Sequence, residues 1–202
     1  MHLAQYFITM TYKFYPQNLW DYDPRYKTSE EHINMLKTIK ANKKKLKWNP
    51  FLNALKEEFS NKEYFIEDRS IISKKDPCFK GSLEKKVNSY RLTLVYFISL
   101  LDNYYTIYYE NPFPDTTSGK TDYPSDIPFI TFNIPPELTA ESLKLKGMIK
   151  KTFKEYVEFP KNLLGMQVDN ICYEDKGHPF DNCGLLATPK MTLFNAFFSN
   201  LI

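Results

Sequence analysis

The sequence has few of the residues from which recognisable catalytic motifs are built. It contains six glycines and three histidines in 202 residues. We find no Gly-rich phosphate-binding loop, no G-x-S-x-G nucleophile elbow and no H-E-x-x-H metal motif. Catalytic groups can also converge from distant positions, so these absences argue against an enzyme without excluding one. We therefore expect neither catalytic residues nor a cofactor.

Cysteine is also rare, and its positions argue against a disulfide framework. The three cysteines, Cys78, Cys172 and Cys183, are an odd number and include no closely spaced pair. Reduced thiols are typical of cytosolic proteins. The N-terminal residues lack the cationic start, the apolar run and the cleavage site of a signal peptide. No stretch approaches the ~20 apolar residues of a membrane-spanning helix, so we expect a cytoplasmic protein that does not enter membranes.

A strong excess of one charge is missing as well. The net charge of +3 is too small to indicate nucleic-acid binding by itself, and it argues against an acidic surface that mimics DNA. Hydrophobic residues make up 43% of the chain and charged residues 25%, which is ordinary for a folded protein. Residues 1–202 are enough to bury a substantial core, so we predict a single domain.

Aromatic residues, in contrast, are abundant: they make up 16% of the chain and include 15 tyrosines. Tyrosine combines a flat, stiff contact area with a polar tip, which suits a recognition surface as well as a core. A genome of low GC content offers a second explanation, because it would also raise the content of Lys, Asn, Ile and Phe.

Residues 88–111, NSYRLTLVYFISLLDNYYTIYYEN, show the clearest pattern in the chain. Asp102 and Asn103 tolerate the positive φ of a two-residue turn. The pattern therefore predicts a long β-hairpin in which Leu100 faces Tyr105. One face is predicted to be core and consists of Leu92, Leu94, Tyr96, Ile98, Leu100, Tyr105, Ile107 and Tyr109. The other face, which includes Tyr104 and Tyr108, is either covered by a helix or open to a partner.

Hydrophobic spacing, capping residues and prolines predict the remaining elements. Strands are expected at residues 6–14, 64–72, 126–134 and 166–173, and a loop at 74–86. Helices are expected at residues 29–45, 50–59, from 139 onward, and at 192–201. In the first helix, Ile33, Leu36 and Ile39 are predicted to point inward. Because strands and helices do not alternate, we predict an α+β fold: a mainly antiparallel sheet around the hairpin, with helices mostly on one face.

Residues 172–183, CYEDKGHPFDNC, contain side chains that can bind metals or act as nucleophiles. Cys172, His178 and Cys183 are spaced as Cys-x5-His-x4-Cys, whereas zinc sites normally contain closely paired ligands such as C-x2-C. Cys172 is also compatible with a small buried residue in a strand. We therefore expect no metal site, and an enzyme that uses this loop is an alternative hypothesis.

A lysine-rich segment offers a second alternative. Lys37, Lys40, Lys44 and Lys47 share one face of a predicted helix, and such a stripe can neutralise phosphates. Lysine is also favoured toward the C-terminal end of a helix by the helix dipole. The segment has no arginine and no aromatic residue that could stack on bases. Weak nucleic-acid binding is therefore the less favoured interpretation.

The third candidate is a protein-binding surface. Trp, Tyr and Arg dominate the energetics of protein interfaces, and a predicted loop places Trp20 and Tyr22 among charged residues. The alternative is that these aromatic residues fold inward and anchor the loop. We predict the partner contacts Trp20, Asp21, Tyr22, Asp23, Tyr104 and Tyr108.

Two segments, SYRLTLVYFISLLDNYYTIYYE and MTLFNAFFSNLI, resemble small immunity proteins of bacterial polymorphic toxin systems. The resemblance identifies no subfamily and carries over no functional residues. It implies a cytosolic α+β protein that binds a cognate protein toxin and catalyses no reaction itself.

Overall fold

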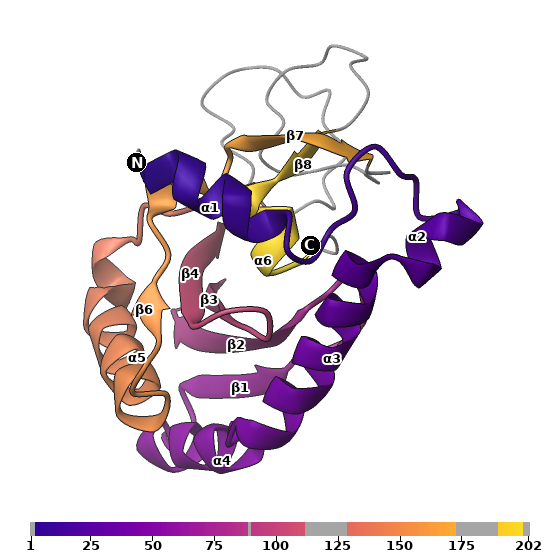
Figure 1. Cartoon of the computed structure of the whole chain (residues 1–202). Coiled ribbons are helices and arrows are strands. Elements are labelled where there is room, and N and C mark those ends of the chain that lie inside the picture. The colour runs from indigo at the N-terminus through magenta and orange to yellow at the C-terminus, as the bar shows by residue number, and fades with distance from the viewer. Residues whose placement is uncertain (1–2, 89, 112–128, 173–189, 200–202) are drawn as a thin grey trace, which may run out of the picture.

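The computed structural model describes residues 3–88, 90–111, 129–172 and 190–199. At its centre lies an antiparallel sheet with the strand order β1-β2-β3-β4-β5, and the short β6 runs parallel to β4 (Figure 1). This confirms the predicted α+β class, although β1 and β5 are shorter than predicted. The strands are β1 (Tyr64–Asp68), β2 (Cys78–Val87), β3 (Tyr90–Ser99), β4 (Tyr104–Asn111), β5 (Phe129–Thr131) and β6 (Val157–Glu158).

Strands β3 and β4 form the predicted hairpin, but their register differs from the prediction by two residues. Ile98 lies opposite Tyr105, because the connection is four residues long instead of two. Leu100 and Leu101 leave the strand and are buried, and the Leu101 N–H donates to Ser99 Oγ at 3.2 Å. A shift of two residues keeps every side chain on its original face. The predicted core face is therefore correct, and each of its residues is buried.

Strand β2 occupies most of the segment that was predicted to be a loop, so that prediction is wrong. The sequence CFKGSLEKKV contains glycine and several charged residues, which have low strand propensity. It nevertheless pairs with β1 on one side and with β3 on the other. Gly81 lies directly opposite Tyr96 in this pairing. Pairing on both sides outweighs the weak local preference.

The three longest helices cover the face of the sheet that was predicted to be core (Figure 1). They are α3 (Glu30–Lys45), α4 (Trp48–Glu58) and α5 (Thr139–Thr152). The ring centroid of Phe51 lies 5.9 Å from that of Tyr96, and Trp48 stacks on Phe79 of β2 at 4.7 Å. Helix α4 therefore packs directly on the central strands.

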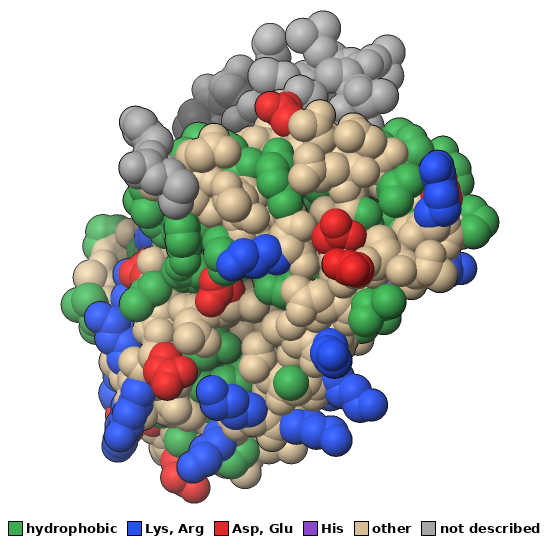
Figure 2. Space-filling view, in the orientation of Figure 1, with side chains coloured by type: hydrophobic (Ala, Val, Ile, Leu, Met, Phe, Trp, Pro, Cys, Tyr) green, Lys and Arg blue, Asp and Glu red, His purple; other side chains and the backbone are tan. Residues whose placement is uncertain are grey.

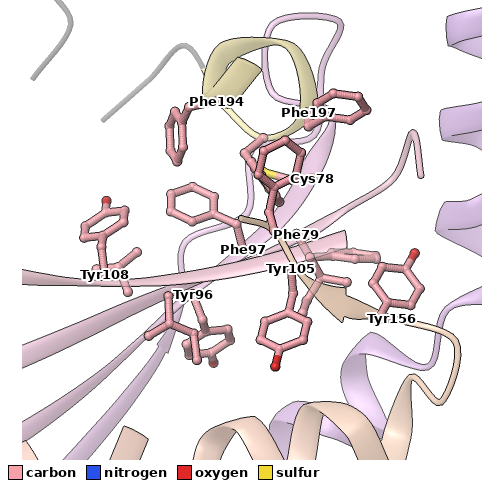
Figure 3. Packing of buried hydrophobic residues seen from close by; sticks show 14 of the residues in the cluster. Cys78, Phe79, Tyr96, Phe97, Tyr105, Tyr108, Tyr156, Phe194 and Phe197 are labelled. Carbon is pink, nitrogen blue, oxygen red and sulfur yellow. The ribbon is translucent and has the colours of Figure 1, made fainter. Parts of the chain in front are cut away.

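The second face of the sheet is covered by elements from the two ends of the chain. They are α1 (Leu3–Thr11), α6 (Leu193–Phe197), β7 (Gln167–Cys172) and β8 (Lys190–Thr192) (Figure 1). Figure 3 shows Phe97 and Tyr108 on this side of the strands, and Tyr96 and Tyr105 on the other. Phe97 meets Phe194 of α6 edge to face at 5.3 Å. The centre of the sheet is therefore buried on both faces.

Helix α1 replaces the strand predicted at residues 6–14. Its threonine hydroxyls are satisfied within the helix, because they donate to carbonyl groups four residues earlier. Thr9 Oγ1 donates to Gln5 O at 2.8 Å, and Thr11 Oγ1 donates to Phe7 O at 3.1 Å. Phe7 is buried, with its ring centroid 4.4 Å from that of Phe159. The composition of this segment is typical of a strand, but packing of Phe7 against the body of the protein favours the helix.

Helix α3 begins where it was predicted but turns a different stripe toward the protein. Ser29 caps it and accepts a hydrogen bond from the His32 N–H at 3.2 Å. Ile33 and Leu36 were predicted to point inward, but they are 50% and 46% exposed. The buried residues are His32, Met35 and Ile39.

The shorter helical segments are α2 (Pro24–Thr28), η2 (Pro136–Leu138) and η3 (Lys161–Leu163). No helix in the described ranges is long and apolar enough to cross a membrane.

Candidate protein-binding surface

Two of the predicted partner contacts form an exposed aromatic stack. The rings of Trp20 and Tyr22 are nearly parallel, with an interplanar angle of 9° and centroids 5.8 Å apart. Tyr22 is 75% exposed and Trp20 is 36% exposed. Figure 2 shows hydrophobic side chains gathered at the end of the molecule where α2 lies. The stack therefore presents apolar area to solvent instead of anchoring the loop from inside.

The chain after the stack is fixed by the start of α2. Asp23 caps this helix by accepting a hydrogen bond from the Arg25 N–H at 2.8 Å, and Pro24 occupies its first turn. The Asp23 carboxylate also binds the Arg25 guanidinium, with Nη2 to Oδ2 at 2.7 Å. Hydrogen bonding to Arg25 lowers the pKa of Asp23. This ion pair between Asp23 and Arg25 lies directly after the two stacked residues in the sequence.

Asp21 connects the stack to the loop between β1 and β2. Its Oδ2 lies 3.1 Å from Lys74 Nζ, which also lies 5.8 Å from the centroid of the Tyr26 ring. Tyr26 is buried, and burial followed by the Asp21 charge raises its pKa to about 12. The same loop carries Ile71, which is 68% exposed. Sequence reasoning missed Lys74, because only the fold brings this residue to Asp21 and Tyr26.

His32 lies beneath this surface and is sensitive to protonation. It is buried against Tyr26, with ring centroids 5.0 Å apart. Within the described residues its Nδ1 has no hydrogen-bond partner. Burial, together with the charges of Lys74 and Lys27, lowers its pKa from 6.5. The fold therefore favours neutral His32.

This shift predicts that the protein loses stability in mild acid. Below about pH 6.5 the unfolded chain binds a proton at His32 before the folded chain does, so the free energy of unfolding falls as the pH falls. Urea unfolding at about pH 7.5 and about pH 5 measures the loss. We expect a smaller loss in His32→Gln than in the original protein. An equal loss in both proteins would contradict the assignment to His32.

Of the two hairpin tyrosines, Tyr108 does not belong to the exposed surface, which corrects its predicted role. Tyr108 is fully buried and packs against Phe97 at 5.5 Å. Burial raises its pKa far above the ordinary value. Tyr104 is partly buried, and its ring meets those of Phe7 and Phe159 edge to face, at 5.3 Å each. Burial, followed by the Asp102 charge, raises the pKa of Tyr104 to about 12. Burial therefore removes Tyr108 from the predicted contact set, whereas Tyr104 remains partly accessible.

A charged cluster on the sheet surrounds Arg69, just after β1. Arg69 Nε lies 2.8 Å from Glu67 Oε2, and Arg69 Nη1 lies 3.1 Å from Glu110 Oε2. A nearby pocket of about 50 Å³ is lined by Arg69, Ile71, Asp76, Cys78 and Lys80. Ligand pockets usually measure ~300–1,000 Å³. The pocket therefore has room for a few solvent-sized groups only.

Burial shifts the pKa values of two ionisable groups in this pocket. Burial raises the pKa of Cys78 well above its ordinary value, so the thiol stays protonated. Burial also lowers the pKa of Lys80, despite opposing effects of nearby carboxylates. Ser199 Oγ donates a hydrogen bond to Asp76 Oδ1 and ties the end of the described chain to this loop.

The Cys–His loop of the alternative hypothesis lies mostly outside the described residues. Cys172 ends β7 and is partly buried, whereas His178 and Cys183 fall outside. In the part of the chain that the structure describes, no three His, Cys, Asp or Glu side chains are placed to hold a metal ion.

Comparison with known proteins found no match to this chain among protein-family models, curated proteins or solved structures.

Proposed function

We propose that the protein is a cytoplasmic protein-binding module, namely an immunity protein that neutralises a cognate bacterial toxin by covering its active site. The observation that carries this proposal is the exposed Trp20–Tyr22 stack. Large aromatic residues contribute most of the binding free energy in many interfaces, where they become buried in the partner. A stack that is three-quarters exposed at Tyr22 has this area available for a partner.

The fixed geometry of the loop further supports the proposal. Binding is weakened by the entropy lost when flexible side chains become ordered. Here the ion pairs of Asp21 with Lys74 and of Asp23 with Arg25 flank Tyr22 on both sides. Both ion pairs restrain the residues next to the aromatic rings, which reduces the entropy that binding would cost. Charged groups around it are suited to set the encounter rate and selectivity.

The test is co-expression with the toxin encoded next to the gene of this protein. We expect the original protein to restore growth of cells that produce the toxin. Replacement of Trp20 or Tyr22 by alanine is expected to weaken toxin binding by about 2 kcal/mol each, roughly 30-fold in Kd. Isothermal titration calorimetry on the purified pair measures this directly.

Phe65→Ala provides a matched control, because Phe65 is an aromatic residue on β1 that is 54% exposed. Removal of this ring changes the exposed aromatic area but leaves the stack intact, so we expect unchanged toxin affinity. Unchanged affinity in the Trp20→Ala, Tyr22→Ala double variant would refute the stack as the binding site. Binding of no neighbouring gene product would argue against the immunity function itself.

A further inference from the structure

Helix α3 presents an exposed surface that is separate from the Trp20–Tyr22 stack. Ile33, Leu36, Lys37, Lys40 and Lys44 are spaced i, i+3, i+4, i+7 and i+11, so they lie on one side of the helix, here called the α3 face. All five side chains are exposed. The buried stripe of α3 lies elsewhere on the helix. The α3 face is thus apolar toward the N-terminal end and basic toward the C-terminal end.

Within the part of the chain that the structure describes, the lysines of the α3 face have no acidic counterparts. Among the described residues, no carboxylate lies within 4.0 Å of Lys37, Lys40 or Lys44. The adjacent Lys45, in contrast, has Glu155 at 3.9 Å. Figure 2 shows Lys and Arg side chains along α3 without acidic side chains between them.

The helix dipole accounts for only part of this pattern. Its favourable effect on lysine is confined to the last turn of a helix. Helix α3 ends at Lys45, so Lys37 and Lys40 lie before its last turn. Lys37 and Lys40 do not serve to cover apolar surface with the aliphatic parts of their side chains either, because both residues are exposed.

We infer that the α3 face docks an acidic amphipathic helix of the partner protein. This inference rests on the proposed function, because it supposes a protein partner, and it assigns a second contact surface. Helix-on-helix docking uses contacts at i, i+3, i+4 and i+7. Ile33 and Leu36 supply the apolar contacts, and the lysines supply charge complementarity.

The opposite partial charges at the two ends of a helix favour an antiparallel orientation of the docked helix. An antiparallel partner helix places its N-terminal half beside the C-terminal half of α3. Acidic residues are favoured near the N-terminus of a helix. The partner helix therefore carries its acidic residues in the N-terminal half, opposite Lys40 and Lys44, and its aliphatic residues in the C-terminal half, opposite Ile33 and Leu36.

Two observations favour a protein over a nucleic acid. Phosphate backbones are bound by charge and hydrogen bonds, and they offer little contact to aliphatic side chains. Ile33 and Leu36 make up the apolar half of the α3 face, and they are about half exposed at 50% and 46%. The α3 face also contains neither arginine nor an aromatic residue that could stack on bases.

The experiment uses a synthetic helical peptide of about 20 residues, long enough to form an isolated helix. It carries glutamates in its N-terminal half and leucines along one side of its C-terminal half. Fluorescence anisotropy measures its binding to the purified chain. We expect the triple variant Lys37→Glu, Lys40→Glu, Lys44→Glu to weaken binding by at least about 10-fold, an effect that decreases with salt. A peptide with the glutamates moved to its C-terminal half is expected to bind more weakly than the first.

Matched variants separate charge from position. Lys56→Glu, Lys150→Glu, Lys151→Glu changes the net charge equally at exposed sites on α4 and α5 and should leave peptide affinity nearly unchanged. Ile33→Ala with Leu36→Ala should weaken binding, whereas Leu143→Ala on α5 should not.

The remaining outcomes overturn the inference. Equal losses in both triple variants would mean that only net charge matters. Tight binding of a DNA duplex that needs the lysines but not Ile33 and Leu36 would assign the α3 face to nucleic acid. Absence of peptide binding to the original protein would also refute it. The assay contains no toxin, and Trp20→Ala should not change it, so its failure is separate from failure of the proposed function.

Discussion

Phe97→Ala is expected to lower the free energy of unfolding by about 3–5 kcal/mol, the range measured for removal of a buried phenylalanine. Phe97 lies in β3, is fully buried, and meets Phe194 of α6 at 5.3 Å and Phe198 at 6.1 Å. Its ring therefore joins the central sheet to the C-terminal part of the described chain. Without it, α6 loses its main aromatic contact with β3, and a cavity remains. Urea unfolding followed by far-UV circular dichroism measures the change.

Phe65→Ala again serves as the control, because it removes the same ring from the same side of the sheet. Phe65 pairs with Glu84, and Glu84 pairs with Thr93, which lies on the Phe97 face of β3. Phe65 is 54% exposed, so its removal should change the free energy of unfolding by less than about 0.5 kcal/mol. Similar losses in the two variants would mean that α6 does not bury this face of the sheet.

Sequence periodicity predicts the faces of the central hairpin better than it predicts what covers them. The alternation of residues 92–109 correctly identifies the core face, because a register error of two residues does not move side chains across the sheet. The burial of Tyr108 was not predictable in this way. It depends on a sheet face that is covered by α1 and α6, from opposite ends of the chain. No local pattern around residue 108 contains that information.

The errors in the remaining elements have the same origin. Pro77 and Gly81 predict a loop where β2 lies. The strand forms there because two neighbouring strands supply its pairing, which no local signal contains. In the candidate surface, local composition left open whether Trp20 and Tyr22 fold inward, and the fold exposes both. Lys74 joins that surface only through the fold.

Gly81→Ala is expected to destabilise the protein by about 2–3 kcal/mol, toward the upper end of the range for overpacking. Gly81 lies opposite Tyr96, whose fully buried ring covers it. A Cβ atom at position 81 would lie 2.8 Å from Tyr96 Cε2 and closer still to Cζ and Oη. Phe51 and Trp48 pack against the ring at 5.9 and 6.1 Å and so restrict its movement. Either the ring or the β2 backbone must shift.

Gly147→Ala is expected to raise the free energy of unfolding, whereas Gly81→Ala lowers it. The pair therefore distinguishes crowding at position 81 from a general effect of replacing glycine. Gly147 lies inside α5, and a Cβ atom there would meet nothing within 4 Å. Alanine has a higher helix propensity than glycine, so we expect the free energy of unfolding to rise by about 0.5–1 kcal/mol.

In a Tyr96→Ala background the penalty of Gly81→Ala should largely disappear, because the overlapping ring is gone. A penalty that persists there would place the cause in the β2 backbone instead of the contact with Tyr96.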